Sequence, residues 1–245
     1  MIDKTFSTTG PVRLTVRLHY GDIEVTSVDA AESTVEIAGP QRVLDAMSIE
    51  QDGDRIAVQM QRKLFGGFSH RHGEPVRVRV TVPHRSRLEL ASAAGETVLD
   101  GTFDRVSAQS AAGEFRAGGE IVGDATVKTV SSHVRLAKVG GDLTAHSVSG
   151  NVIAEAVGGS VSAKSVSGHV SIGSVRDGRV DVQSVSGDVE VGIAHGTNVD
   201  VDAVTASGTL SSEVPLSGSR GAATGPTVVV RGKTVSGDVR LFRAA

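Results

Sequence analysis

A ten-residue stretch that combines serines, a glycine and a carboxylate recurs along the chain. Residues 182–191 read VQSVSGDVEV, and close copies occupy residues 145–154, 163–172 and 232–241. A nucleophilic serine needs a base within hydrogen-bond reach and donors for the oxyanion. No recurring histidine accompanies Ser149, Ser167 and Ser186. The stretch is therefore typical of a structural corner, and we expect no catalytic residue.

Metal binding is a second chemistry that the polar residues suggest. The position after the corner residue holds Glu114, His133, Asn151, His169, Asp188, Thr209 and Asp238. Calcium takes about six to eight oxygen ligands. Because this position does not hold an acidic residue in coil after coil, only Asp188 could join such a site. Zinc at His70 and His72 with His84 or Glu74 would need three convergent ligands, which the spacing does not establish. We expect no metal and no cofactor.

Carbohydrate chemistry is a third possibility, because many β-helices act on polysaccharides. Such sites use paired carboxylates and usually stacking aromatic rings. Only 3% of the residues are aromatic, and the six Phe are scattered. A carbohydrate-binding or hydrolytic β-helix would have to join Asp181, Asp188 and Glu190 in one outward groove, and it remains an alternative.

Composition and charge narrow the function classes further. The formal net charge is −3, which gives no basic excess for nucleic acid. The chain has no Cys, which excludes disulfides and thiolate sites. The start of the sequence lacks an apolar signal-peptide core, and no run of about 18 apolar residues occurs. We expect a cytoplasmic chain without stable membrane insertion.

The corners recur at a nearly constant period. They fall at Gly95, Gly113, Ser132, Gly150, Gly168, Gly187 and Gly208, and a further copy is Gly237. A second set of corners precedes four of these by nine residues, at Gly123, Gly141, Gly159 and Gly178. A fixed period of about 18–19 residues is typical of a solenoid. Each coil then consists of two short strands joined by glycine corners, because glycine reaches positive φ without penalty.

Apolar and polar residues alternate within each of the two strands of a coil, and this alternation predicts which side chains fill the interior. The predicted core includes Val152, Val170 and Val189 after the corner and Val148, Val166 and Val185 at the corner itself. With thirty Gly and no Trp, the core must be thin and filled by small aliphatic side chains. The fold class is all-β, a single-stranded, β-helix-like solenoid preceded by an antiparallel β cap.

Two segments of different character flank or interrupt the repeats. Residues 1–90 predict longer antiparallel strands that cap the solenoid and merge into it, and residues 91–245 form the repeats. Residues 63–74 predict a loop, and residues 211–230 predict a loop insertion before the last coil. That last coil lies near the C-terminus without a cap, so strand-edge pairing between subunits is expected.

The sequence also resembles a known family. The strand pair ending in GDIEV, the run RVTVPHRSRLELASAAGETVL and the serial SVSGxV corners resemble the bacterial putative-adhesin domain family of unknown function, which includes LiaG-like proteins. The resemblance covers most of the chain. It implies a β-solenoid without established catalytic residues and a link to envelope stress.

These observations predict a non-enzymatic structural or protein-interaction scaffold that binds a protein partner or itself. The basis for this prediction is that the corner geometry recurs along the chain, whereas no set of potentially catalytic or metal-binding residues recurs with it. A bactofilin-like polymer is an alternative within that class, and the carbohydrate-acting β-helix is an alternative outside it.

Overall fold

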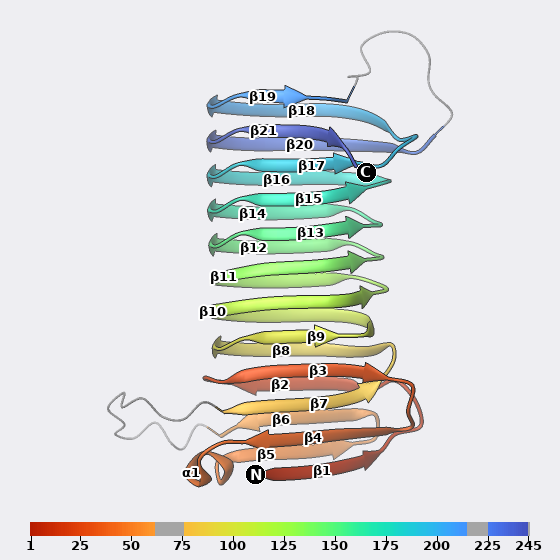
Figure 1. The fold of residues 1–245 in the computed structure, drawn as a ribbon, viewed down its shortest axis with the longest axis vertical. Coiled ribbons are helices and arrows are strands. Elements are labelled where there is room, and N and C mark those ends of the chain that lie inside the picture. Colours follow the sequence, from red (N-terminus) through yellow and green to blue (C-terminus); the bar gives the residue numbers. More distant parts are fainter. Residues whose placement is uncertain (62–75, 215–224, 245) are drawn as a thin grey trace.

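The chain folds into a β-solenoid whose coils stack along one axis (Figure 1). The computed structural model describes residues 1–61, 76–214 and 225–244. One cluster of buried hydrophobic residues runs through the stack from Val12 to Leu241. The all-β solenoid predicted from the period of the corners is therefore confirmed.

The N-terminal elements build one end of the stack. They are β1 (Ile2–Ser7), β2 (Arg13–Leu18), β3 (Asp22–Val28), β4 (Glu32–Ala38), α1 (Gln41–Leu44), β5 (Met47–Asp52), β6 (Arg55–Met60), β7 (Arg77–Pro83), β8 (Ser86–Ala94) and β9 (Thr97–Asp100). Two long strands follow, each bending from one face to the other: β10 (Thr102–Ile121) and β11 (Ala125–Val139).

The remaining strands build the regular coils and the C-terminal end. They are β12 (Leu143–Ser149), β13 (Val152–Val157), β14 (Val161–Ser167), β15 (Val170–Val175), β16 (Gly178–Ser186), β17 (Val189–Ile193), β18 (Asn198–Ser207), β19 (Leu210–Ser212), β20 (Thr227–Ser236) and β21 (Val239–Arg243).

Hydrogen-bonded pairing arranges these strands in two faces. One face runs β5-β6-β2-β8-β10-β11-β12-β14-β16-β20-β18. The other runs β1-β4-β7-β3-β9-β10-β11-β13-β15-β17-β21-β19. In the regular coils the register places each residue directly over its counterpart in the next coil, so equivalent side chains form columns.

The thin core lies between the two faces and follows strict alternation. Val152, Val170 and Val189 are buried in one column, as predicted. Alanines of the opposite face, such as Ala145 and Ala163, are buried as well. Small side chains suffice because the interior is only as deep as two facing side chains.

The corner valines do not belong to this core, so the prediction for Val148, Val166 and Val185 is wrong. Each is close to half exposed, at 47%, 48% and 48%. Alternation continues unbroken to the end of the strand and turns the preceding serine inward and the valine outward. Ser165 and Ser184 are buried in the positions that the prediction gave to the valines.

The corner glycines are required for two reasons, which Gly168 illustrates. Its φ is +144°, a conformation that L side chains rarely adopt, and an added Cβ would collide with the carbonyl oxygen of Gly150. Gly150, Gly187 and Gly237 share the positive φ. Ser132 fits the same column without positive φ.

The N-terminal segment is an antiparallel cap only in part. β1 pairs with β4, β4 with β7, and β5 with β6, all antiparallel. In contrast, β2 and β3 lie between neighbours that run parallel to them, β6 and β8 on one face and β7 and β9 on the other. The alternation of their residues gives the same signal in both kinds of sheet, so the prediction of antiparallel pairing for the whole segment is wrong. The division of the chain near residue 90 stays a prediction.

The order of coils at the C-terminal end differs from the order in the sequence. The coil β20/β21 lies against β16/β17, and the earlier coil β18/β19 stacks outside it (Figure 1). The prediction that the last coil in the sequence forms the exposed end is therefore wrong. An added Cβ on Gly208 would meet Gly237, not Gly187, which shows the exchanged order at the corner.

The two predicted loops fall largely on residues that are not described. The 63–74 segment lies outside the described residues. The predicted insertion 211–230 is too wide, because Ser211 and Ser212 belong to β19 and β20 begins at Thr227. Residues 215–224 lie outside the described residues.

Candidate functional site

A shallow hollow follows the serine–glycine corner across three regular coils. Its volume is about 390 Å³, and its lining residues are His133, Ser149, Gly150, Asn151, Ser167, Gly168, His169, Ser186 and Gly187. The strands β12, β14 and β16 end there in Ser149, Ser167 and Ser186, which stand in register. The hollow is thus built from the repeated motif that the sequence showed first.

From the corner at Ser132 to the corner at Gly187, the residue after the corner carries a side-chain acceptor for the next coil. His133 Nδ1 accepts the backbone N–H of Asn151 at 3.3 Å, and Asn151 Oδ1 accepts that of His169 at 3.1 Å. His169 Nδ1 accepts the N–H of Asp188 at 3.2 Å. The series continues from Asp188 Oδ1 to the N–H of Asp238 at 2.9 Å. We call this series the corner ladder.

The corner ladder explains a column whose residue types look unrelated in the sequence. Imidazole, amide and carboxylate all offer an acceptor at a similar distance from the backbone. The chain turns at the glycine, so the next N–H points along the stack, where this side chain accepts it. Asp188, the one candidate calcium ligand, fills this structural role and also lies 3.2 Å from His169 Nδ1 through its second oxygen.

The corner serines Ser149, Ser167 and Ser186 line the hollow. Among the described residues, no hydrogen bond involves the hydroxyls of Ser149, Ser167 and Ser186, so these groups face the hollow without tying the turn. The buried serine two positions earlier ties the turn at one corner, where Ser147 Oγ donates to the carbonyl of Gly150 at 3.3 Å, whereas the buried hydroxyls of Ser165 and Ser184 have no partner in the described part of the chain. Alternation within the strand was the signal that places this earlier serine inward.

Beside the hollow, the corner valines form an exposed apolar column. Its members share one register position on successive strands: Val130, Val148, Val166, Val185 and Val235. Their exposed fractions run from 47% to 55%. At a strand separation of about 4.8 Å, five residues span about 19 Å. We call this the valine column.

A basic column runs parallel to the valine column, two residues earlier in each strand. It holds Lys128, His146, Lys164 and Lys233, with Gln183 in the same register. Burial lowers the pKa of His146 below its ordinary value, and the charges of Lys164 and Lys128 lower it further. The apolar strip is therefore bordered by positive charge on one side.

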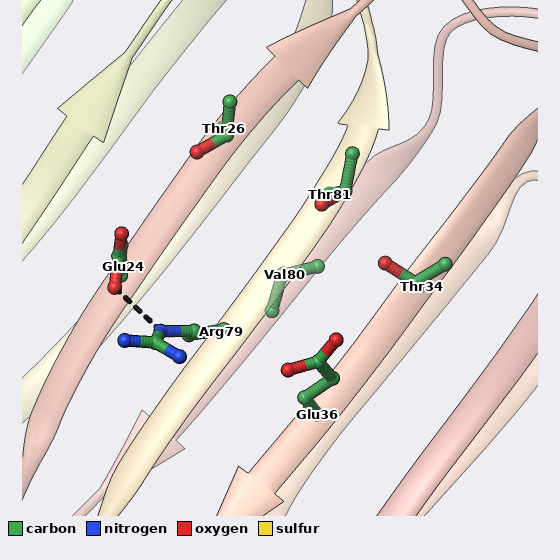
Figure 2. Close-up of a pocket in the computed structure, with 7 residues that line it drawn as sticks. All are labelled: Glu24, Thr26, Thr34, Glu36, Arg79, Val80 and Thr81. Carbon is green, nitrogen blue, oxygen red and sulfur yellow. Dashed lines mark hydrogen bonds and ion pairs between the residues drawn. The ribbon is translucent and has the colours of Figure 1, made fainter.

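A second, smaller hollow lies on the opposite face near the N-terminal end. Figure 2 shows Arg79 of β7 between Glu24 of β3 and Glu36 of β4, with three threonines in the next row. Arg79 Nε lies 2.9 Å from Glu24 Oε2, and both groups are about half exposed. Arg79 pairs with the Glu24 carboxylate, and such exposed pairs stabilise a fold little. The arrangement is that of a surface ion pair and does not provide an acid and a base for catalysis.

The remaining candidate residues do not form a site. Within the described ranges, no group of three potential ligands could hold a metal ion. His84 instead shares a 2.8 Å hydrogen bond with Ser27, while His70, His72 and Glu74 lie outside the described residues.

The groove required by the carbohydrate-acting alternative is absent from the part of the chain that the structure describes. Asp181 lies on β16 and Glu190 on β17, which belong to different faces, with Asp188 at the corner between them. The structure therefore does not bring these three carboxylates together.

Comparisons with known proteins identify a family and similar solved structures. The sequence model of the Toastrack DUF4097 family matches residues 12–242. A putative adhesin from Bacteroides fragilis, 12% identical, matches 98% of this chain and 96% of its own with a TM-score of 0.58. A putative adhesin from Parabacteroides merdae, also 12% identical, matches 98% of this chain and 95% of its own with a TM-score of 0.49.

At these identities a structural likeness shows the fold alone. No curated protein matches the sequence significantly. In the described ranges, no helix has the length and apolar character needed to cross a membrane. The family match spans nearly the whole chain, and the register and corners are those of a β-solenoid. The chain belongs to the Toastrack DUF4097 family.

Proposed function

We propose that this chain is a non-enzymatic scaffold that binds a protein partner along the valine column. The observation that carries the proposal is a row of five half-exposed valines in register, with polar side chains on either side of it in the same strands. Contiguous apolar patches with a polar rim mark interaction sites on soluble proteins. The basic column beside it calls for a partner whose apolar groove is bordered by carboxylates.

The valine column has enough unburied surface to support specific binding. Complete burial of a valine contributes about 1.5–3 kcal/mol, so the exposed half contributes about 1 kcal/mol. Five such residues give about 5 kcal/mol before the cost of association is subtracted. Removing three of them should weaken a complex by about 3 kcal/mol, or roughly 100-fold in Kd.

Site-directed crosslinking in the native host tests the proposal. A photoreactive amino acid at Val166 should crosslink to one protein, and the same group at Ile153 on the opposite face should not. The captured protein is then purified, and its affinity is measured for the wild type and for the combined Val148→Ser, Val166→Ser and Val185→Ser variant. Equal affinities, or equal crosslinking from Ile153, would contradict the proposal. Capture of another copy of this chain would identify the partner as self.

End-to-end association is a second candidate, because the two ends of the stack differ. At the C-terminal end, β18 and β19 each pair on one side only among the described strands, and Leu210 is 48% exposed. At the N-terminal end, Lys4 lies opposite Val35 on the inward side of β1 and donates to the carbonyl of Ile49 in β5. A charge pointing inward from an edge strand opposes further pairing.

This asymmetry favours a dimer through β18 and β19 over a bactofilin-like filament, which needs both ends. Sedimentation analysis should show a concentration-dependent dimer that Val201→Lys abolishes, and electron microscopy should show discrete particles. Filaments would contradict this reading, and a monomer at all concentrations would remove the second candidate without affecting the first.

A further inference from the structure

We infer that the hollow beside the corner ladder binds a short segment of a neutral, linear glycan. The inference does not depend on the valine column. It rests on three side chains in successive coils, His133, Asn151 and His169, which the corner ladder forces to present hydrogen-bond donors to the hollow.

The backbone fixes the orientation of each donor. His133 Nδ1 accepts the N–H of Asn151, so its neutral ring carries the proton on Nε2, the nitrogen remote from the ladder. His169 Nδ1 accepts the N–H of Asp188 in the same way, and a second proton drawn to Nδ1 by Asp188 Oδ2 at 3.2 Å would leave the Nε2 proton in place. Asn151 accepts through Oδ1, so its amide nitrogen is left to donate. Both imidazoles are exposed, and within the described residues the Asn151 amide nitrogen has no partner. The result is a row of three N–H donors whose orientation is set before any ligand arrives.

The lining of the hollow also includes hydroxyl groups in the same register. Ser149 and Ser167 stand one coil apart, as do Ser167 and Ser186, and their hydroxyls are free to donate or accept. Successive coils are separated by about 4.8 Å, a spacing close to the rise of one sugar along an extended glycan. A polymer laid along the stack can therefore meet one donor and one hydroxyl at each sugar.

The charge at one end of the row favours a neutral ligand. Asp188 follows His169, whereas Glu114, which precedes His133 at the other end, is ion-paired with Arg116 at 3.0 Å and lies 3.8 Å from Arg135. A polyanion that uses the His169 donor would meet the Asp188 carboxylate, and like charges repel. The hydroxyls and ring oxygens of a neutral glycan accept from the donors without this repulsion. The row is also short, so the expected contact covers about three or four sugars.

The ladder itself supplies matched variants for the test. Asn151→Asp keeps the Oδ1 acceptor, as Asp188 does for Asp238 at 2.9 Å, but replaces the outward donor with an acceptor. His169→Asn keeps both the acceptor and an outward donor, as Asn151 does. One variant should lose binding and the other should retain it, while the backbone ladder persists in both.

The experiment is an NMR titration of the full chain with cellohexaose, chitohexaose and hexagalacturonate at millimolar concentration. We expect a neutral hexasaccharide to shift the His133 and His169 ring signals, and Asn151→Asp to weaken its affinity by about tenfold, the effect of one hydrogen bond. His169→Asn should bind within about twofold of the wild type. Circular dichroism checks that each variant is folded.

Several results would overturn the inference. These are an absence of binding by both neutral hexasaccharides, tighter binding of hexagalacturonate than of either, or equal binding by Asn151→Asp and the wild type. Loss of binding in folded His169→Asn would show that the donor row is not the determinant. Because the crosslinking test reports on the valine column, either proposal can fail while the other stands.

Discussion

Val166 and Val170 lie in the same coil on either side of a corner, and the structure assigns them opposite environments. Val170 is 1% exposed in the core column, whereas Val166 is 48% exposed in the valine column. Replacing each by aspartate therefore separates the two environments with one chemical change. Val170→Asp removes a buried side chain worth about 1.5–3 kcal/mol and buries an unpaired carboxylate, which costs about 3–5 kcal/mol.

The expected loss in the free energy of unfolding is thus about 5–8 kcal/mol for Val170→Asp, a large part of the stability of a typical domain. Val166→Asp sacrifices only the buried half of the side chain, about 1 kcal/mol or less. Its carboxylate also points to the face that carries Lys164, two residues away. The loss should therefore remain small.

Urea unfolding followed by circular dichroism measures the two losses, and hydrogen exchange locates them. A solenoid is stabilised by contacts between neighbouring coils, so Val170→Asp should also expose amides in β13 and β17. If Val166→Asp destabilised the chain as much as Val170→Asp, the alternation through the corner would be wrong. If neither variant changed the unfolding curve, the assignment of the core would be wrong.

Three further predictions concern the corners and the basic column. Gly168→Ala should cost several kcal/mol of stability, because the new Cβ would sit at positive φ and collide with the carbonyl oxygen of Gly150. Gly53→Ala has positive φ but no atom near the new Cβ, so it should cost about 1 kcal/mol. Equal losses in thermal unfolding would disprove the close approach of Gly168 to Gly150. Asp142 Oδ1 accepts the N–H of Ser160 at 2.7 Å, so Asp142→Ala should cost about 1 kcal/mol and Asp142→Asn almost nothing in urea unfolding. The pKa of His146 lies below 6.5, so on acidification the unfolded chain takes up a proton at this histidine before the folded chain does, and the free energy of unfolding falls as the pH drops through 6.5. Lys164→Gln should raise the pKa of His146 in an NMR titration. An unchanged pKa would show that Lys164 does not lower it.

The repeat made the solenoid predictable from the sequence, because regularly spaced glycine corners with alternating valines between them are compatible with few other folds. The core columns at Val152, Val170 and Val189 followed from alternation alone. The error at Val148, Val166 and Val185 came from giving hydrophobicity more weight than alternation at the strand end. Period two applied without exception places these residues outside.

The order of coils and the corner ladder could not be read from the sequence in the same way. Parallel and antiparallel strands share one pattern of alternation, so the placement of β2 and β3 between later strands leaves no local signal. The interval from Gly187 to Gly208 is longer than the others, which in retrospect marks the exchanged coil. The ladder was hidden because it selects for an acceptor, a property that histidine, asparagine and aspartate share although they look dissimilar.

The exchanged coils constrain how the chain can be made. During synthesis β18 and β19 leave the ribosome before β20 and β21, yet their partners in the finished stack are those later strands. Until then, the growing end offers β16 and β17 as neighbours of matching register, with Gly187 available in place of Gly237. The coil β18/β19 must therefore either wait unpaired or pair early with β16/β17 and be displaced. The final stage of folding is thus the insertion of β20/β21 between two coils, and the coils cannot simply add one after another in sequence order.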